Sequence, residues 1–182
     1  MTEKQLKDFV EVPDGTDVLI DNFTIKAKGK IGESSKSFEN TNLQVKKEGS
    51  KVYFSINGDL RSQKKLLNTF ISHFKNMIQG VNSGYTYKLK ICSSHFPMTV
   101  SSEKNKITIK NFLGEKIPRT AKIYEGVNVK IDGDVITVEG ADKEKTSQTG
   151  ANIENATRIT NKDRRRFQDG IFFTEKAGKK IR

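Results

Sequence analysis

Residues 43–54 read LQVKKEGSKVYF, and residues 127–138 read VNVKIDGDVITV, with the same alternation of apolar and polar side chains. Alternation with a period of two is typical of β-strands, because successive side chains point to opposite faces. In each stretch an acidic residue followed by glycine, Glu48-Gly49 or Asp132-Gly133, interrupts the pattern. Such a pair favours a tight turn, so each stretch is predicted to be a β-hairpin.

The two hairpins lie 84 residues apart, and the same offset aligns other parts of the chain. FTIK at 23–26 aligns with ITIK at 107–110, and Pro13 aligns with Pro97, without a gap. Three matches at one offset indicate an internal duplication. We therefore predict two related domains in tandem, residues 1–82 and 83–182.

A helix is predicted to complete the first repeat. Residues 59–80, DLRSQKKLLNTFISHFKNMIQG, carry apolar side chains at intervals of three and four, the spacing of one face of an α-helix. Asp59 or Ser62 is expected to cap its start, and Gly80 to take the left-handed conformation past its end. The apolar face should cover the sheet formed by the preceding strands.

The corresponding segment of the second repeat, residues 142–159, is a weaker helix former because Gly150 lies inside it. We still predict a helix there, since the second sheet needs the same cover. The fold class is therefore α+β: two tandem related domains, each a small mostly antiparallel sheet packed against a helix.

The charge of the chain is high and unevenly placed. Its formal net charge is +11, yet residues 1–60 hold nine lysines and ten acidic residues, whereas residues 157–182 hold nine basic and three acidic residues. A strongly basic balance indicates a polyanionic partner. Nucleic acid is favoured over a membrane surface, because no helix shows a basic stripe beside an apolar face.

The second repeat starts with a strand, YTYKLKI at 85–91, after a short connection, GVNSG at 80–84. In a strand the residues Tyr85, Tyr87, Leu89 and Ile91 face one side, and Thr86, Lys88, Lys90 and Cys92 face the other. We predict that the tyrosine side faces the core and that Lys88 and Lys90 lie on the side that faces the nucleic acid.

The chain offers little for catalysis. Two histidines, one cysteine (Cys92) and scattered carboxylates have no metal-ligand spacing, and no nucleophile has a base nearby. We expect no enzyme, no metal and no cofactor. The start of the chain has no apolar signal region, and no stretch approaches the ~18 apolar residues of a membrane span. We therefore expect a soluble intracellular protein.

Two features of the sequence bear on the kind of nucleic acid that it could bind. Gly29-Lys30-Ile31-Gly32 has the GxxG form that clamps RNA backbone in KH modules, but there the loop joins two helices, and here it follows a strand. A glycine turn between strands is the preferred interpretation. The chain has no Trp, and most of its eleven Phe lie at predicted core positions. Such a surface suits phosphates and the shape of structured RNA better than splayed bases.

Three stretches of the second half closely resemble large-subunit ribosomal protein six, in its archaeal and eukaryotic form: HFPMTV (95–100), NFLGEKIPR (111–119) and NKDRRRFQDGIFF with TEKAG after it (161–178). The resemblance covers nearly the whole chain, including VPDGTDVLIDN (12–22). It implies a structural component of the large ribosomal subunit, not an enzyme. The implied binding site is large-subunit rRNA close to the sarcin-ricin loop and the base of the factor-recruiting stalk.

The resemblance also implies neighbouring large-subunit proteins, translation factors nearby and a cytoplasmic location on the ribosome. The arginines of residues 161–173 are then predicted to hold folded rRNA, because a planar guanidinium can bridge two phosphate oxygens. Asp163 and Asp169 are expected to orient the arginines or cap turns, and Phe167 and Phe172 to pack the segment onto its domain. The predicted rRNA-binding residues are Lys88, Lys90, His95, Lys116, Arg119, Arg158, Lys162, Arg164, Arg165 and Arg166.

Other interpretations stay open. A run of three arginines is often only a solvated surface. The same two domains could also form a free RNA-binding regulator, which unlike a ribosomal component would not stay with large subunits through a moderate salt wash. An enzyme of RNA metabolism is a third choice, but it would need a cluster of titratable groups in one cleft, which the sequence does not supply.

Overall fold

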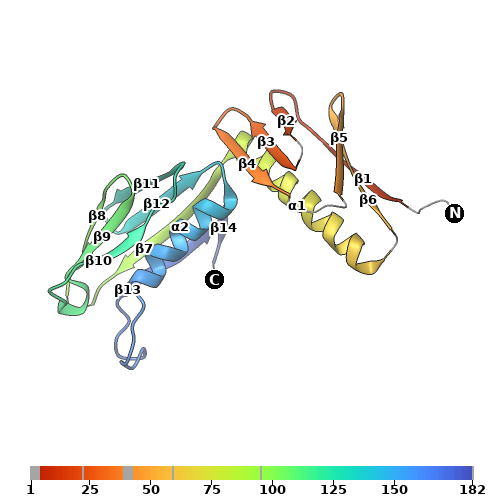
Figure 1. The fold of residues 1–182 in the computed structure, drawn as a ribbon. Helices are drawn as coiled ribbons and strands as arrows, with labels where there is room; N and C mark the ends of the chain where they lie inside the picture. The colour runs from red at the N-terminus through yellow and green to blue at the C-terminus, as the bar shows by residue number, and fades with distance from the viewer. Residues whose placement is uncertain (1–4, 22, 39–42, 59, 95, 182) are drawn as a thin grey trace. The chain divides into compact units, whose positions relative to one another are not determined.

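The computed structural model describes residues 5–21, 23–38, 43–58, 60–94 and 96–181 (Figure 1). The chain divides into two compact units, Met1–Gly84 and Tyr85–Arg182. Each unit combines antiparallel strands with one long α-helix, which confirms the predicted α+β fold class. The strands of each unit are divided between two sheets, where the sequence had indicated one.

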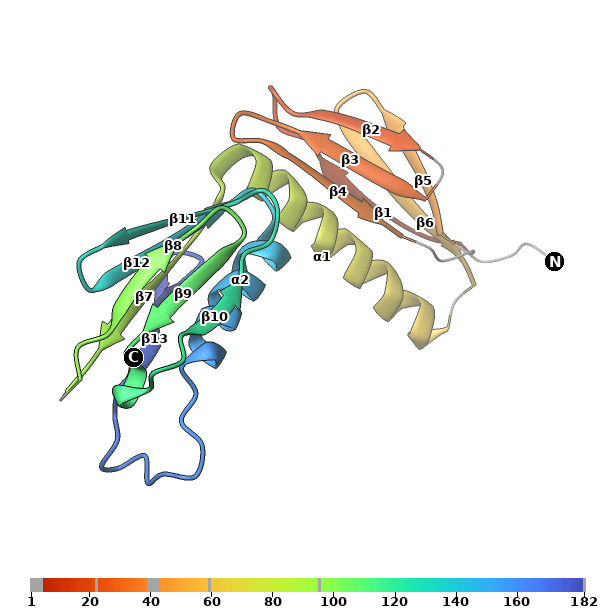
Figure 2. The ribbon, with the colours of Figure 1, turned by 60° about the vertical axis from the view of Figure 1, so that its left-hand side comes forward.

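The first unit contains two three-stranded sheets, with strand orders β1-β6-β5 and β2-β3-β4. Its helix, α1, contacts strands of both sheets, so the core lies between the helix and the sheets (Figure 2). The bounds of its elements are β1 Gln5–Glu11, β2 Asp17–Asp21, β3 Thr24–Lys28, β4 Glu33–Ser37, β5 Leu43–Glu48, β6 Lys51–Asn57 and α1 Arg61–Ser83.

The second unit contains a five-stranded sheet, order β11-β12-β7-β13-β14, and a three-stranded sheet, order β10-β9-β8. Its helix, α2, likewise contacts both sheets. The bounds of its elements are β7 Tyr85–Cys92, β8 Thr99–Ser102, β9 Lys106–Lys110, the 3-10 turn η1 Phe112–Gly114, β10 Arg119–Lys122, β11 Val127–Asp132, β12 Val135–Gly140, α2 Lys143–Ala156, β13 Gly170–Lys176 and β14 Lys179–Lys180.

The two units share one strand order, which supports the duplication. The order β1-β6-β5 recurs as β7-β12-β11, and β2-β3-β4 recurs as β8-β9-β10. Strands β5 and β11 occupy equivalent positions at the offset of 84 residues, from Leu43–Glu48 to Val127–Asp132. In the described part of the chain, the second unit differs by adding β13 and β14 beside β7.

The hairpin turns lie one residue later than the sequence indicated. Glu48 pairs with Lys51, and Asp132 pairs with Val135, so the two-residue turns begin at Gly49 and Gly133. Both glycines have a positive φ, 60° and 58°, a conformation that lacks steric cost only for glycine. The acidic residue of each pair therefore ends a strand and does not enter the turn.

Helix α1 has the predicted apolar face, with buried Leu67, Ile71, Phe74, Met77 and Ile78. Its start differs from the expectation, since Ser62 lies inside the first turn and Leu60 is the N-cap residue. The backbone N–H of Leu60 donates to Oε1 of Gln63 at 3.1 Å, which replaces part of the missing side-chain cap. Asp59, the other predicted cap, lies outside the described residues.

The end of α1 also corrects a prediction. The helix continues through Gly80 to Ser83, and Gly84 is the residue with a positive φ, 70°. Val81 explains the extension, because it is fully buried and adds another turn to the apolar face of Met77 and Ile78. The predicted connection at 80–84 is thus mostly helix.

Strand β7 has the predicted phase. Tyr85, Tyr87, Leu89 and Ile91 are buried, while Lys88 and Lys90 are exposed. The predicted orientation of the side chains is confirmed. The RNA-facing role of the two lysines stays a prediction.

The segment GKIG at 29–32 is a turn between β3 and β4, as the preferred interpretation held. The N–H of Gly29 donates to the carbonyl of Gly32 at 3.0 Å, and the N–H of Ile31 donates to the carbonyl of Val81 at 2.9 Å. A side chain at Gly29 would place its Cβ 2.7 Å from that same Val81 carbonyl. The turn therefore packs on the last turns of α1, unlike a loop between two helices.

Helix α2 is present as predicted and begins with an effective cap. The carboxylate of Asp142 accepts hydrogen bonds from the backbone N–H groups of Glu144 and Lys145, at 2.8 and 3.2 Å. Gly150 is buried against β13, where a Cβ would lie 2.7 Å from the ring of Phe173. The glycine that weakens this helix in isolation is thus what lets the helix approach the sheet closely.

Candidate nucleic-acid interface

Residues 157–169 connect α2 to β13 and project from one end of the second unit (Figures 1 and 2). We call this segment the arginine loop. Asp163 shapes its tip, because its carbonyl accepts from the N–H groups of Arg166 and Phe167 at 3.1 and 3.0 Å. Its carboxylate accepts from the N–H of Arg165 at 3.0 Å. One aspartate thereby closes a turn that contains all three adjacent arginines.

The three arginines are not equivalent. The guanidinium of Arg165 donates to both carboxylate oxygens of Asp163, at 3.0 to 3.2 Å. These hydrogen bonds hold the pKa of Asp163 below its usual value, as expected for a carboxylate that pairs with arginine. Arg164 and Arg166 are exposed, and neither has a carboxylate partner in the described part of the chain. The loop therefore presents two arginines whose charge is not neutralised within the protein.

Asp169 anchors the other end of the arginine loop. Only 2% of this residue is exposed, and its Oδ1 accepts from the N–H and the hydroxyl of Ser94 at 2.8 and 2.5 Å. Ser94 follows β7, so the hydrogen bonds tie the loop to the end of the neighbouring strand. The predicted roles are confirmed for Asp163, which orients an arginine and closes a turn, whereas Asp169 instead ties the loop to the residue after β7.

Arg119, at the start of β10, anchors the beginning of the loop. Its Nε and Nη2 donate to the two carboxylate oxygens of Glu115, at 2.7 and 2.6 Å. Its Nη1 donates to the carbonyls of Ala156 and Arg158, at 3.0 and 3.1 Å. The guanidinium also lies over the ring of Phe112, 4.3 Å from the centroid.

Arg119 was predicted to contact phosphate, and in the structure most of its donors are engaged within the protein. Four of its five N–H donors are used inside the protein, so little remains for a phosphate. The carbonyls that it binds lie at and just after the C-terminus of α2, where a cation is favourable. The hydrogen bonds from Arg119 lower the pKa of Glu115, and the charge of Lys162 contributes a smaller part.

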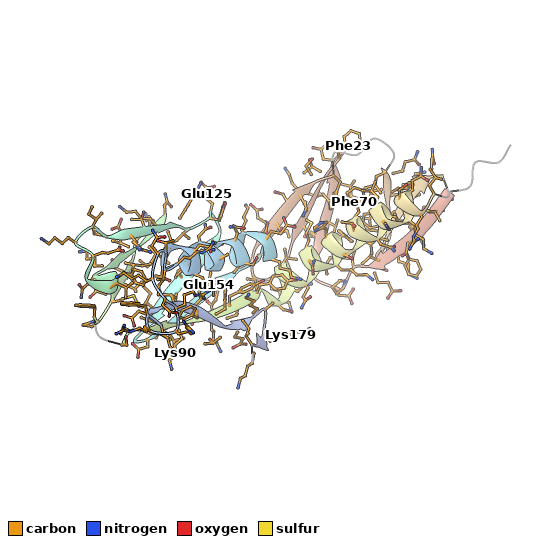
Figure 3. All side chains as sticks on the ribbon, turned by 90° about the horizontal axis from the view of Figure 1, so that it is seen from below. Phe23, Phe70, Lys90, Glu125, Glu154 and Lys179 are labelled. Atoms are coloured by element: carbon orange, nitrogen blue, oxygen red, sulfur yellow. The ribbon has the colours of Figure 1, made fainter. Side chains whose placement is uncertain are left out.

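The lysines of the predicted set also differ in whether they are paired within the protein. Nζ of Lys88 lies 3.0 Å from Oε2 of Glu175, so this lysine is paired. Lys90 is exposed on the outer side of β7 (Figure 3) and, like Lys116, has no ion-pair partner among the described residues. His95, also predicted, lies outside the described residues.

Phe167 and Phe172 contradict the expectation that they pack onto the domain. They are 37% and 38% exposed, and neither belongs to the apolar core of the second unit. Lys162 covers the ring of Phe167, with Nζ 4.8 Å from the centroid. The period of two along β13 could have shown this for Phe172, because Ile171 and Phe173 on either side of it face the core.

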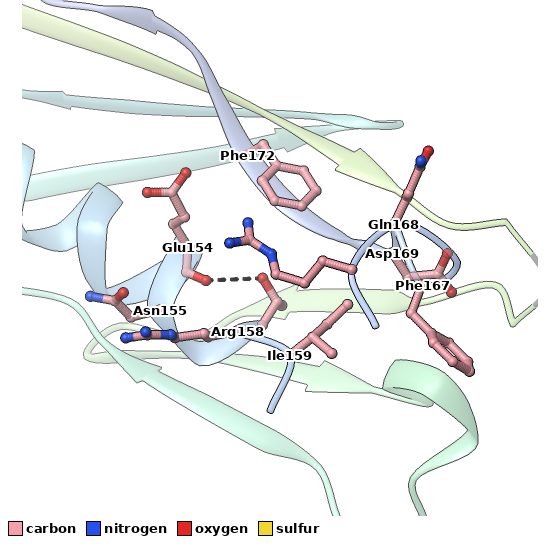
Figure 4. Close-up of a pocket in the computed structure, with 10 residues that line it drawn as sticks. Glu154, Asn155, Arg158, Ile159, Phe167, Gln168, Asp169 and Phe172 are labelled. Carbon is pink, nitrogen blue, oxygen red and sulfur yellow. Dashed lines mark hydrogen bonds between the residues drawn. The ribbon is translucent and has the colours of Figure 1, made fainter. Parts of the chain in front are cut away.

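An open hollow of about 720 Å³ lies between the end of α2, the arginine loop and the start of β13 (Figure 4). Its lining combines charged and aromatic side chains, among them Glu154, Arg158, Arg164, Phe167, Gln168 and Phe172. Its lining residues all fall within residues 154–172, but the sequence pattern of this stretch does not show how the loop folds back over the start of β13, so sequence reasoning did not find the hollow.

The described residues offer neither a metal site nor a membrane-spanning helix. No group of three or more His, Cys, Asp and Glu side chains there is arranged to hold a metal ion. Neither helix there has both the length and the apolarity needed to cross a bilayer.

The second of two similar α+β units carries a basic loop that is anchored at both ends, an arrangement typical of the class of nucleic-acid-binding proteins. Residues 96–170 match the family model of ribosomal protein L6. The chain is 40% identical to large ribosomal subunit protein uL6 of Methanococcus vannielii over 174 residues, 96% of either chain. It is 43% identical to the uL6 protein of Methanocella arvoryzae over 169 residues, 92% of this chain and 96% of the relative.

The chain therefore belongs to the ribosomal protein L6 family. Members of this family are structural components and not enzymes, which confirms the prediction that the chain is not an enzyme. The resemblance on which the sequence prediction rested is confirmed as well.

Proposed function

We propose that the protein is a structural component of the large ribosomal subunit and that it binds large-subunit rRNA through the arginine loop. The observation that carries this proposal is the pair of exposed arginines, Arg164 and Arg166, on a loop anchored at both ends. The names of both relatives, large ribosomal subunit protein uL6, support the ribosomal assignment.

The anchoring favours binding because it reduces the ordering cost. Arg119 holds the start of the loop, Asp163 closes its tip and Asp169 holds its end. Cations that are already positioned lose less conformational entropy when a phosphate arrives. Guanidinium groups also match phosphate oxygens with two parallel hydrogen bonds.

The predicted residues then fall into three groups. Lys90, Lys116, Arg158, Lys162, Arg164 and Arg166 are the proposed phosphate contacts, with His95 still a prediction. Lys88 and Arg165 share their charge with Glu175 and Asp163, so they are proposed as weaker contacts. Arg119 is proposed to position the loop instead of binding RNA.

Family membership also supports a more detailed placement. We propose that the protein sits close to the sarcin-ricin loop and the stalk base of cytoplasmic ribosomes. Neighbouring large-subunit proteins would then contact it, with translation factors nearby.

A salt series with deproteinised large-subunit rRNA tests the arginine loop. Replacing Arg164, Arg165 and Arg166 together with Ala should weaken binding and lower the slope of log affinity against log salt by about two, one for each unpaired arginine. The fold should persist, since exposed charges seldom support a core.

The matched control removes the same charge from the first unit, by replacing Lys26, Lys28 and Lys30, which are all exposed, with Ala. Its slope should stay close to that of the unchanged protein. Equal losses in the two variants would mean that only net charge matters and that the arginine loop is no special contact.

The alternative, a free RNA-binding regulator, is separated by co-sedimentation. A ribosomal component should stay with large subunits through a moderate salt wash. Release of the protein under conditions in which other large-subunit proteins stay bound would favour the regulator.

A further inference from the structure

We propose that the hollow beside the arginine loop receives one unstacked base of the bound RNA and that this base stacks on Phe172. The inference rests on the proposed RNA binding. It adds the part of the RNA that is bound, an unstacked base, and the residue that binds it, Phe172. Sequence reasoning had disfavoured base stacking because the phenylalanines seemed committed to cores, and the exposure of Phe172 removes that objection.

The position of Phe172 is that of a supported platform. A Cβ built on Gly170 would lie 2.7 Å from Cζ of Phe172, so the far end of the ring rests against the glycine. The flanking Ile171 is fully buried, which fixes the strand that carries the ring. An exposed aromatic ring supported on a strand among basic residues is what base stacking requires.

Phe167 is a poorer platform in the same hollow. The amino group of Lys162 lies over its ring at 4.8 Å from the centroid, so a cation already occupies one face. No cation–π contact covers Phe172 in the described part of the chain. The geometry therefore selects Phe172 as the ring that a base can reach.

Cations surround this ring where the phosphates of a stacked nucleotide would lie. Arg158 and Arg164 line the same hollow. Lys90 is the register partner of Phe172 on β7, and directly opposite residues of antiparallel strands face the same side. A nucleotide whose base lies on Phe172 thus has basic groups available on two sides for its flanking phosphates.

Glu154 supplies a hydrogen-bond acceptor beside the platform (Figure 4). Its Oε1 accepts from the N–H of Phe173 at 3.4 Å, which holds the carboxylate next to β13. Its Oε2 has no hydrogen-bond partner among the described residues. A carboxylate oxygen can accept from the exocyclic amino group of a base, so Glu154 offers a bound base a hydrogen bond beside the ring of Phe172.

The test combines three replacements of Phe172 with two RNA probes. The probes are deproteinised large-subunit rRNA, which has unpaired bases, and a fully paired RNA duplex, which has none to offer. Phe172→Ala should weaken binding to the rRNA by about 5- to 150-fold, the range for loss of one base–aromatic stack, and leave the duplex affinity unchanged. The salt slope should stay the same, since no charge is removed.

Phe172→Trp and Phe172→Leu separate stacking from simple apolar contact. The Trp variant should bind the rRNA at least as well as the unchanged protein, and the Leu variant should lose most of what the Ala variant loses. Phe167→Ala is the matched control and should have a clearly smaller effect. Because Phe172 is exposed, all variants should unfold at the same denaturant midpoint, which is measured first.

Several results would overturn the inference. One is an unchanged rRNA affinity for Phe172→Ala, and another is an equal loss of affinity for the duplex. A third is equal rRNA affinity of the Leu and Trp variants, which would indicate an apolar contact such as a protein side chain. An equal loss for Phe167→Ala would contradict the assignment to one ring. If the unchanged protein binds neither RNA, the proposed function itself fails, and that result is distinct from all of these.

Discussion

Arg119 joins parts of the second unit that are far apart in the chain. One guanidinium contacts Glu115, the ring of Phe112 and the carbonyls of Ala156 and Arg158. A lysine could not make this set of contacts, because its ammonium lacks the planar fork. The residue therefore positions the arginine loop without belonging to it.

Replacing Arg119 with Ala should lower the free energy of unfolding by about 1–2 kcal/mol, since it removes the hydrogen bonds to two carbonyls and an ion pair that is partly exposed to solvent. Chemical denaturation of the variant measures this. Arg119→Lys should recover only part of the loss. The exposed Lys116, three residues earlier, is the matched control, and Lys116→Ala should change the stability by less than about 0.5 kcal/mol.

The RNA salt series distinguishes this positioning role from the phosphate contact first predicted for Arg119. A phosphate contact would lower the salt slope by about one and leave stability unchanged. A positioning residue gives the opposite pattern, a loss of stability with little change of slope.

Glu115 should make the stability of the protein depend on pH in the acid range. Its pKa is held below the usual 4.5, first by the hydrogen bonds from Arg119. A depressed carboxylate pKa means that the stabilisation is fully present above the unfolded value and is lost as the pH falls through the folded value. The stability difference between the unchanged protein and Glu115→Gln should therefore be constant from pH 7 to about 5.5 and shrink below pH 4.5.

Denaturant unfolding of both proteins at pH 7, 5, 4 and 3 checks this. A difference that stays constant down to pH 3 would show that the Glu115–Arg119 pair does not contribute to stability.

The sequence could reveal only part of what Arg119 does. Glu115 and Arg119 are four residues apart, so their proximity can be inferred from the sequence. The two carbonyl partners follow 37 and 39 residues later, and nothing local connects them to Arg119. The sequence therefore favours a phosphate contact for this basic residue, whereas its hydrogen bonds within the fold support a positioning role.

At the scale of elements, Gly150 decides how closely α2 approaches β13. Gly150→Ala should raise helix propensity by about 1 kcal/mol, yet its Cβ would lie 2.7 Å from the ring of Phe173. We expect the clash to dominate, with a net loss of about 1–3 kcal/mol in the free energy of unfolding. Thermal or chemical denaturation measures the loss.

Phe173→Leu provides the partner for a double-mutant cycle. The smaller side chain should relieve the clash, so the double variant should be more stable than the sum of the two single effects. Simple additivity would mean that the ring of Phe173 is not what excludes a side chain at residue 150.

Periodicity was enough to predict α1 and both repeated hairpins, because these elements depend on neighbours in the chain, whereas α2 was predicted from the repeat. The end of α1 was missed, since Gly80 and Gly84 are both plausible stops and only the burial of Val81 separates them. The division into two sheets per unit was also missed. Strand pairing is a nonlocal property, and the alternation of side chains within one strand does not indicate which strand it pairs with.

At the scale of the whole molecule, each unit has its own apolar core. Residues 1–84 alone should therefore fold, with cooperative unfolding and dispersed amide signals in an NMR spectrum. Residues 85–182 should do the same. A fragment of residues 1–84 that unfolds without cooperativity would contradict the view that the repeat is an independent folding unit.

A further control addresses the boundary. The fragment 1–79 removes the last turn of α1, including the buried Val81 and the carbonyl that binds Ile31. It should be less stable than residues 1–84, because the helix end is part of the core.

The position of β13 between β7 and β14 has a consequence for the rate of folding. Strand β7 is made early, at residues 85–92, but its partner β13 follows only at residues 170–176, whereas β1 and β6 of the first unit pair within residues 5–57. Contacts between distant residues slow folding, because the long intervening loop must close first. The second unit should thus refold more slowly than the first, with one edge of β7 open to pairing with other chains in the meantime. The half of the molecule that carries the arginine loop is also the half most exposed to aggregation before it is complete.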